Sequence, residues 1–147
     1  MHKEFEILVE KIAREIKKFS VNLDDAVIKH GAKNRIAGAA GFKHQIDVSV
    51  EIPMKRLLLI ECKRYKSKVT LKDMLILIAR IDDIRKKRNI DVGGVFFTTV
   101  GYTRPAIIVG GYNNIELNTI ENIRYFVAKL AGNVLVKPPP LVIKREP

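Results

Sequence analysis

Two acidic residues and a lysine occupy positions from which their side chains can meet on one face of a β-hairpin. Asp47 lies in a segment that alternates between apolar and polar residues, and Glu61 and Lys63 end an apolar run further along the chain. If the chain turns near Met54, Asp47 and Glu61 are equally far from the turn and face each other, with Cβ atoms roughly 5 Å apart. On a strand, Glu61 and Lys63 point to the same side and Cys62 points away. The sequence therefore predicts two carboxylates and one ammonium on one patch of sheet.

Two carboxylates this close repel each other unless a cation lies between them. A divalent ion such as Mg²⁺ fits, because it takes oxygen ligands and keeps several waters; the main-chain carbonyl of Cys62 is available as a third protein ligand. Such an ion polarises a phosphate oxygen and lowers the pKa of its water, which suits attack on a phosphodiester. Lys63 would then orient that water or neutralise the charge that develops on the phosphate.

The alternative for these residues is an ordinary surface ion pair, since acids and lysines alternate on many exposed strands. Two features argue against it. The residues before Glu61, from Leu57 to Ile60, are all apolar, which is typical of a central strand, so Glu61 and Lys63 emerge from the core. A dense basic run, residues 63–68, follows directly.

The whole chain is strongly basic. Its 147 residues include 27 Lys and Arg against 16 Asp and Glu, which gives a net charge of +11. Such an excess attracts polyanions, most often a nucleic-acid backbone, although a preference of the source for lysine would give the same balance. For His44 and Gln45 the alternative is a strand-edge role without function. We expect the following residues to contact DNA as a group: Lys33, Arg35, Lys43, His44, Gln45, Arg64, Lys66 and Lys68.

The first half of the chain predicts a helix and a hairpin. Residues 3–19 carry apolar side chains at helical spacing. The Gly-containing stretch 20–42 shows no regular pattern. A strand at 45–52, a turn at 53–56 and a second strand at 57–63 follow. One face of the first strand should carry Ile46, Val48, Val50 and Ile52.

A long helix is expected after this hairpin. Thr70 suits its N-cap, Asp73 suits its first turn, and the cations at 85–88 suit its C-terminus. Its buried stripe should consist of Leu71, Met74, Leu75, Ile78, Ile81 and Ile84.

The rest of the chain alternates strands and helices. A buried strand at 92–100 precedes a short helix that starts at 103–105, with proline in its first turn. A brief strand at 115–117 and a helix at 119–130 follow. This order predicts an α/β (α+β) fold in which a mixed sheet is flanked by helices.

The length fits a single domain, residues 1–132, followed by an extended proline-rich tail, residues 133–147. The lone cysteine cannot form an intrachain disulfide and suits a reducing compartment. The N-terminus has no signal-peptide pattern, and no apolar run is long enough to cross a bilayer. We expect a cytoplasmic, nucleoid-associated protein that has no membrane partner.

Four segments resemble motifs of the PD-(D/E)xK nuclease superfamily, and within it of the restriction-endonuclease-like, Mrr-like group. Residues 42–48 resemble the segment that bears the first metal-binding acid, and residues 60–65 resemble the (D/E)xK strand. Residues 94–103 resemble the later strand–turn–helix segment, and residues 3–6 resemble the opening of the first helix. The motifs stand in the family's order over roughly residues 3–118.

The resemblance implies a metal-dependent deoxyribonuclease with a restriction-endonuclease-like core. Asp47 and Glu61 would hold Mg²⁺, for which Mn²⁺ would substitute, and Lys63 would complete the catalytic set. The first helix sometimes adds an acid in this family; Glu6 matches best, and Glu10 lies one turn away on the same face. The sequence departs from the family at Ile46, where a proline usually precedes the first acid.

Several functions share this fold. A dimer specific for branched DNA would be a Holliday-junction resolvase, and a protein that binds without cutting would be a DNA-binding module. An interaction domain unrelated to DNA would have to explain the charge otherwise. We favour a homodimeric endonuclease, because one such site cuts one strand and duplex cleavage needs two. The complete set of Asp47, Glu61 and Lys63 argues against a module that only binds.

Overall fold

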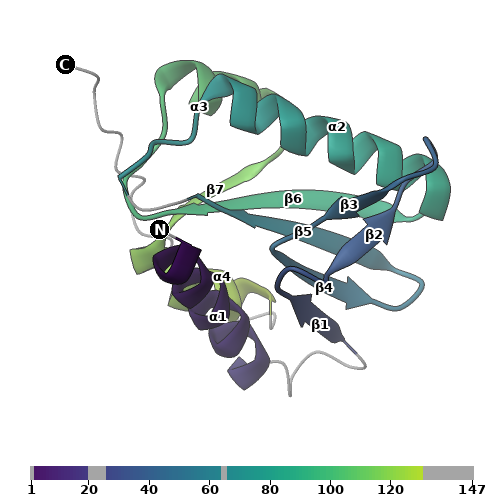
Figure 1. Cartoon of the computed structure of the whole chain (residues 1–147), viewed down its shortest axis with the longest axis horizontal. Helices are drawn as coiled ribbons and strands as arrows, with labels where there is room; N and C mark the ends of the chain where they lie inside the picture. Colours follow the sequence, from purple (N-terminus) through teal and green to yellow (C-terminus); the bar gives the residue numbers. More distant parts are fainter. Residues whose placement is uncertain (1, 20–25, 64–65, 131–147) are drawn as a thin grey trace.

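A five-stranded mixed sheet runs through the middle of the molecule, with helices on both faces (Figure 1). The computed structural model describes residues 2–19, 26–63 and 66–130. The strands lie in the order β1-β4-β5-β6-β7, and their bounds are β1 (Val27–His30), β4 (Val48–Ile52), β5 (Arg56–Cys62), β6 (Asp91–Thr98) and β7 (Glu116–Thr119).

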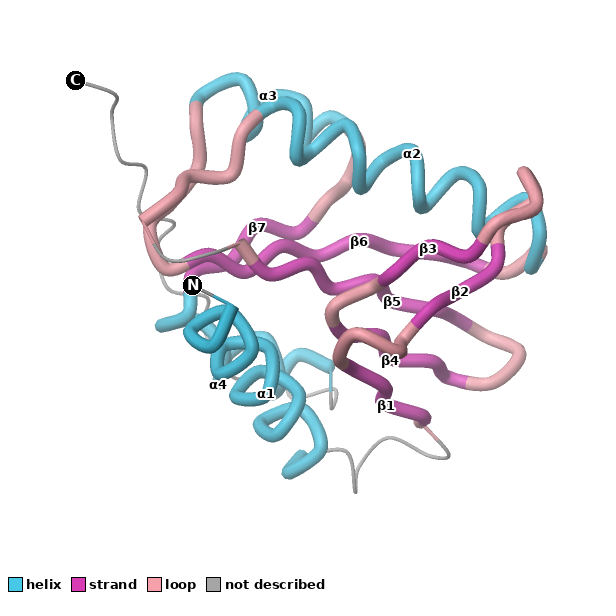
Figure 2. Tube along the Cα trace, viewed as in Figure 1, coloured by secondary structure: helices cyan, strands magenta, loops and turns pink. Residues whose placement is uncertain are grey.

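Two helices cover each face of this sheet (Figure 2). On one face lie α1 (His2–Phe19) and α4 (Ile123–Leu130), the second of which follows a short 3-10 turn, η2 (Ile120–Asn122). On the other face lie α2 (Leu71–Arg88) and α3 (Arg104–Tyr112). The predicted mixed sheet flanked by helices is confirmed, and the second half of the chain follows the predicted order of elements.

The hairpin of β4 and β5 has the predicted register. The two strands pair antiparallel with Val48 opposite Ile60, and the turn between them contains Met54 with a φ of 63°. One residue before the start of β4, Asp47 therefore comes opposite Glu61. The next strands, β6 and β7, continue the sheet in parallel to β5.

The apolar run of β5 is explained by burial on both faces. Leu57 and Leu59 pack beneath α2, whereas Leu58 and Ile60 pack against the α1 side. A strand covered on both faces has no solvent-facing positions, so it reads as a continuous apolar segment. The same alternation sends Glu61 to the α2 side.

A separate two-stranded sheet stands beside α2. It consists of β2 (Arg35–Ala37) and β3 (Lys43–Gln45), which pair antiparallel. Together with β1, β2 falls in the stretch 20–42, for which we predicted no regular structure. That prediction was wrong for residues 27–30 and 35–37, because strands of four and three residues are too short to show a period. Residues 20–25 lie outside the described part of the chain.

The strand predicted at 45–52 is broken between β3 and β4. Ile46 packs in the core beneath α2, whereas Val48 packs in the core on the α1 side. At the break, the side-chain amide of Asn34 donates hydrogen bonds to the Ile46 carbonyl (3.0 Å) and to Ser49 Oγ (3.1 Å). The prediction that Ile46 and Val48 share a face was therefore wrong, since alternation holds only within an unbroken strand.

Helix α2 begins as predicted but buries a different stripe. The Thr70 side chain accepts from the Asp73 N–H, and the Asp73 carboxylate accepts from the Thr70 N–H, which forms a capping box. Leu71 and Leu75, predicted to be buried, are 37% and 50% exposed. The buried residues are spaced three, four and three positions apart, and Leu71 and Leu75 lie beside this stripe. The buried positions are Met74, Leu77, Ile81 and Ile84.

No helix among residues 2–19, 26–63 and 66–130 is long and apolar enough to cross a membrane. The tail expected from residue 133 lies outside the described residues.

Candidate active site

Asp47 and Glu61 lie side by side where the β4–β5 hairpin faces α2. Asp47 Oδ2 accepts a hydrogen bond from the N–H of Cys62 (2.9 Å), and both carboxyl groups line one cavity. Each residue is only 9% exposed. The antiparallel register thus brings together two acids that are separated by a whole hairpin in the sequence.

The environment disfavours negative charge on this pair. Burial raises the pKa of Asp47, although the hydrogen bonds from Cys62 and Glu61 and the charge of Arg80 oppose the rise. Burial raises the pKa of Glu61 well above its ordinary value, and the Asp47 carboxylate adds to that rise, while Arg80 opposes it. Two buried acids whose charged forms are disfavoured gain from an added cation.

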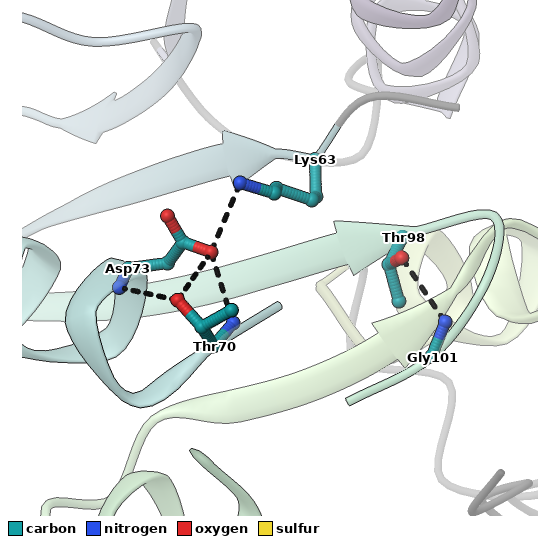
Figure 3. A network of polar contacts seen from close by, with 5 residues as sticks. All are labelled: Lys63, Thr70, Asp73, Thr98 and Gly101. Atoms are coloured by element: carbon teal, nitrogen blue, oxygen red, sulfur yellow. Dashed lines mark hydrogen bonds and ion pairs between the residues drawn. The ribbon is translucent and has the colours of Figure 1, made fainter. Parts of the chain in front are cut away.

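Lys63 is held in place by the start of α2 (Figure 3). Its Nζ lies 3.0 Å from Asp73 Oδ2, and the same oxygen accepts from the N–H and the hydroxyl of Thr70. The Lys63 N–H donates to the Phe97 carbonyl (2.9 Å), which extends the parallel pairing with β6. The helix cap therefore fixes the position of the lysine ammonium.

Arg80 is a site residue that the sequence reasoning missed. It lies two turns after Asp73 on α2, and its Nη1 is 3.2 Å from Glu61 Oε1. The only sequence signal was the seven-residue spacing from Asp73, which places both side chains on nearly the same face of a helix. Which strand that face covers is decided by tertiary packing.

These residues line a cavity of about 510 Å³ between β5 and α2. The cavity reaches the molecular surface, because its lining includes exposed side chains such as Gln45 and Ser67. Its polar and charged lining residues are Gln45, Asp47, Glu61, Lys63, Ser67, Asp73 and Arg80.

The two acids considered on the first helix lie at a neighbouring cavity. Glu6 and Glu10 are exposed and line a space of about 490 Å³, which shares Phe5, Gln45 and Asp47 with the first cavity. Asp47 thus stands between both spaces. Neither Glu6 nor Glu10 lines the cavity that contains Glu61.

The residues predicted to contact phosphate are only partly gathered. Lys33, Arg35 and Lys43 are exposed on or next to the β2–β3 sheet, and Lys66 is exposed after β5. Gln45 is exposed at the rim of the cavity. Lys68 is half-buried. Arg64 lies outside the described residues.

His44 is engaged inside the protein, which counts against the expected DNA contact. Only 8% of the residue is exposed, and its Nε2 lies 2.7 Å from Asp83 Oδ2 of α2. Its ring stacks at a tilt on Phe42, with centroids 4.4 Å apart. Asp83 also accepts from the N–H of Ala40 (2.8 Å). The histidine therefore ties the β2–β3 sheet to α2, and we assign it a structural role.

Cys62 contributes its backbone and not its thiol. Its side chain is buried in the core on the α1 side, and burial raises the pKa of the thiol well above its ordinary value. The thiol is therefore kept neutral, as expected for a buried apolar residue. Its N–H donates a hydrogen bond to Asp47. Its carbonyl is the group that we expected to bind a metal ion.

The donor set suits a hard divalent cation. Two adjacent carboxylates supply oxygen ligands of the kind that Mg²⁺ takes, and their disfavoured negative charge would be relieved by it. Within residues 2–19, 26–63 and 66–130, no cluster of three or more His, Cys, Asp and Glu side chains is arranged to hold a metal.

The sequence matches a known family over most of its length. A family model described as "Restriction endonuclease", Mrr_cat, matches residues 2–127. Among curated proteins, none matches the sequence significantly.

Solved structures share the fold at low identity. The protein of unknown function AF1548 is 20% identical, with a TM-score of 0.54 over 74% of this chain and 57% of that chain. A repair endonuclease from Pyrococcus abyssi is 16% identical, with a TM-score of 0.53 over 82% and 46%. The small subunit of the heterodimeric restriction endonuclease R.BspD6I is 16% identical, with a TM-score of 0.54 over 89% and 79%. The chain spans about half the length of the first two structures.

Proposed function

The chain belongs to the restriction endonuclease family that the Mrr_cat model describes, and from this membership we propose that it is a metal-dependent DNA endonuclease. The observation that carries the proposal is the meeting of Asp47, Glu61 and Lys63 in one cavity. The fold alone would not support an activity, because one fold hosts many functions. The site supports it, since two buried acids and a fixed lysine are what metal-assisted phosphodiester hydrolysis needs.

We propose Asp47 and Glu61 as the side chains that hold the metal, with the Cys62 carbonyl as an additional ligand. Mg²⁺ is the proposed ion and Mn²⁺ a substitute, because both accept carboxylate and carbonyl oxygens. When bound, such an ion polarises the scissile phosphate and lowers the pKa of water beside it.

Lys63 is proposed to act on the phosphate directly. In hydrolysis, a water molecule gives up a proton as its oxygen bonds to phosphorus, the bond from phosphorus to the leaving sugar oxygen breaks, and that oxygen takes up a proton. Negative charge grows on the phosphate during this exchange, and a fixed ammonium stabilises it. The contact with Asp73 keeps the lysine within the cavity before DNA arrives.

DNA is the proposed partner, bound mainly through its backbone. The net charge of +11 supports this, as do the exposed cations Lys33, Arg35, Lys43 and Lys66. We propose that Gln45 at the cavity rim also contacts DNA, and that a homodimer supplies the second site for the other strand. Because DNA is the substrate and the only cysteine is a free thiol, we propose a cytoplasmic, nucleoid-associated location.

The proposal is tested by cleavage of end-labelled duplex, single-stranded and four-way-junction DNA, with Mg²⁺, with Mn²⁺ and with EDTA. We expect cutting that needs the metal and favours the duplex. Preference for the junction would make the protein a resolvase. Salt-sensitive DNA binding with no cutting under any metal would show that the fold serves binding alone and would overturn the proposal.

A further inference from the structure

Arg80 places a cation against the acidic pair from the opposite wall of the cavity. It projects from the face of α2 that also carries Asp73 and Leu77 into the same space. Its Nη1 lies 3.2 Å from Glu61 Oε1, and the two side chains are 30% and 12% exposed. The contact is therefore an ion pair in a partly enclosed site, where charges interact more strongly than at an open surface.

The charges of the cavity are divided into two pairs. Lys63 is bound to Asp73, so its charge is already balanced by a carboxylate other than Asp47 and Glu61. Arg80 is bound to Glu61, with Nη1 and Oε1 3.2 Å apart, and it lines the same cavity as Glu61 and Asp47. Arg80 thus supplies the positive charge that the carboxylate pair needs in the absence of a metal.

We propose that Arg80 is a positioning residue that acts as a resident counter-ion: it holds the Glu61 carboxylate in place and competes with the divalent cation for it. The inference rests on the proposed metal site at Asp47 and Glu61. It goes beyond that site by assigning a residue that sets how tightly the metal binds.

The geometry of the contact suits such a competitor. A guanidinium bonded to a carboxylate through two parallel N–H groups forms a strong, directional pair. Here one nitrogen, Nη1, makes the bond to one oxygen, Oε1. A divalent ion with twice the charge can displace such a contact, and Arg80 would remain near it as a repelling charge.

The test is calorimetric titration of the full chain with Mn²⁺ at pH 8 in the absence of DNA, so that the readout does not depend on activity. Arg80→Gln should bind Mn²⁺ more tightly, by on the order of tenfold, because the competing charge is gone. Arg80→Lys, which keeps the charge, should stay near the wild-type affinity. Lys87→Gln makes the same change of charge at an exposed position later on α2 and should also leave it unchanged.

The outcomes separate this inference from the proposed function. If wild type binds no divalent cation, the proposed metal site fails and the role of Arg80 fails with it. If wild type binds and Arg80→Gln binds equally or more weakly, the role of Arg80 alone is refuted. Arg80→Met, which keeps the aliphatic stem, must shift the affinity in the same direction as Arg80→Gln, and thermal unfolding would verify that each variant is folded.

Discussion

At the scale of single residues, the site depends on which charged side chains hold one another. Lys63 is anchored by Asp73, and the same carboxylate oxygen closes the capping box of α2 with Thr70. Asp73 thus both caps the helix and holds Lys63. These two roles can be separated by comparing Asp73 with a neighbour that only caps the helix. Thr70 belongs to the cap but does not touch Lys63 in any contact shown in Figure 3.

We predict that Asp73→Asn lowers both stability and cleavage, whereas Thr70→Ala lowers stability alone. Each change weakens the cap and should cost about 1 kcal/mol of unfolding free energy. Only Asp73→Asn removes the charge that fixes Lys63, so its kcat should fall by roughly tenfold, as expected when a catalytic group is misplaced. Denaturant unfolding and single-turnover cleavage would measure the two effects. Equal cleavage by both variants would show that Asp73 has no role beyond the cap.

The sequence predicted the meeting of Asp47 and Glu61 because a hairpin register can be counted from its turn. Both residues are the same number of positions from Met54, and the structure pairs the intervening positions one to one. Arg80 was beyond this reasoning. Its partner depends on how α2 lies across the sheet, and neither periodicity nor propensity fixes that angle.

At the scale of elements, α2 holds the side chains of the site in place. Its residues Asp73, Arg80 and Asp83 contact Lys63, Glu61 and His44, respectively. The first two contacts reach the end of β5, and the third reaches the β2–β3 sheet. A single helix thus contacts both the residues around the acidic pair and the small sheet that carries Lys43 and Arg35, and it sets their relative positions.

We predict that the contact between Asp83 and the β2–β3 sheet stabilises the protein only while Asp83 is charged. The hydrogen bond from His44 and the N–H of Ala40 lower the pKa of Asp83 in the folded protein. A lowered pKa contributes stability above the ordinary value for an aspartate and loses it as the pH falls through the folded value. Asp83→Asn should therefore be less stable than wild type at neutral pH.

The difference between Asp83→Asn and wild type should shrink as the pH falls from about 4, the ordinary value for an aspartate, through the lower pKa of Asp83 in the folded protein. Denaturant unfolding at a series of pH values would measure it. Asp82→Asn is the control, because Asp82 is exposed on the same helix and pairs only with Lys86 among the ion pairs of the described residues. A difference that stays constant down to pH 3 would refute the charged contact.

The elements that the sequence missed are short or interrupted. β1 and β2 have four and three residues, and strand 45–52 is broken at Ile46 by hydrogen bonds from Asn34. Asn34, the side chain that hydrogen-bonds at this break, lies 12 positions away in the sequence. Long elements such as α2, which leaves a helical spacing, and β5, which leaves a continuous apolar run, were predicted.

At the scale of the whole molecule, the positive charge is the property that bears on DNA. The chain of 147 residues has a net charge of +11. The ion pairs of the site do not account for it, because their opposite charges cancel. Neutralising DNA phosphates releases the counter-ions that surround them, so binding of this kind weakens steeply with salt.

We predict that DNA affinity falls by about a thousandfold between about 50 and 200 mM salt if about six phosphates are neutralised. Removing one contacting cation, as in Lys43→Ala, should weaken binding to all sequences alike and reduce the salt slope by about one. Fluorescence anisotropy over a range of salt concentrations would measure both. Affinity that hardly changes with salt would mean that DNA is not bound through its backbone.

The most direct test of the proposed active site is single-turnover DNA cleavage by Asp47→Asn and Lys63→Ala at saturating metal. Asn at position 47 keeps the shape of the side chain but removes the charge, and Asp82→Asn makes the same change on the exposed side of α2. We predict that both site variants lose at least about a hundredfold in rate while they retain DNA binding, and that Asp82→Asn cuts normally. Cleavage at the wild-type rate by either site variant would contradict the assignment of the active site.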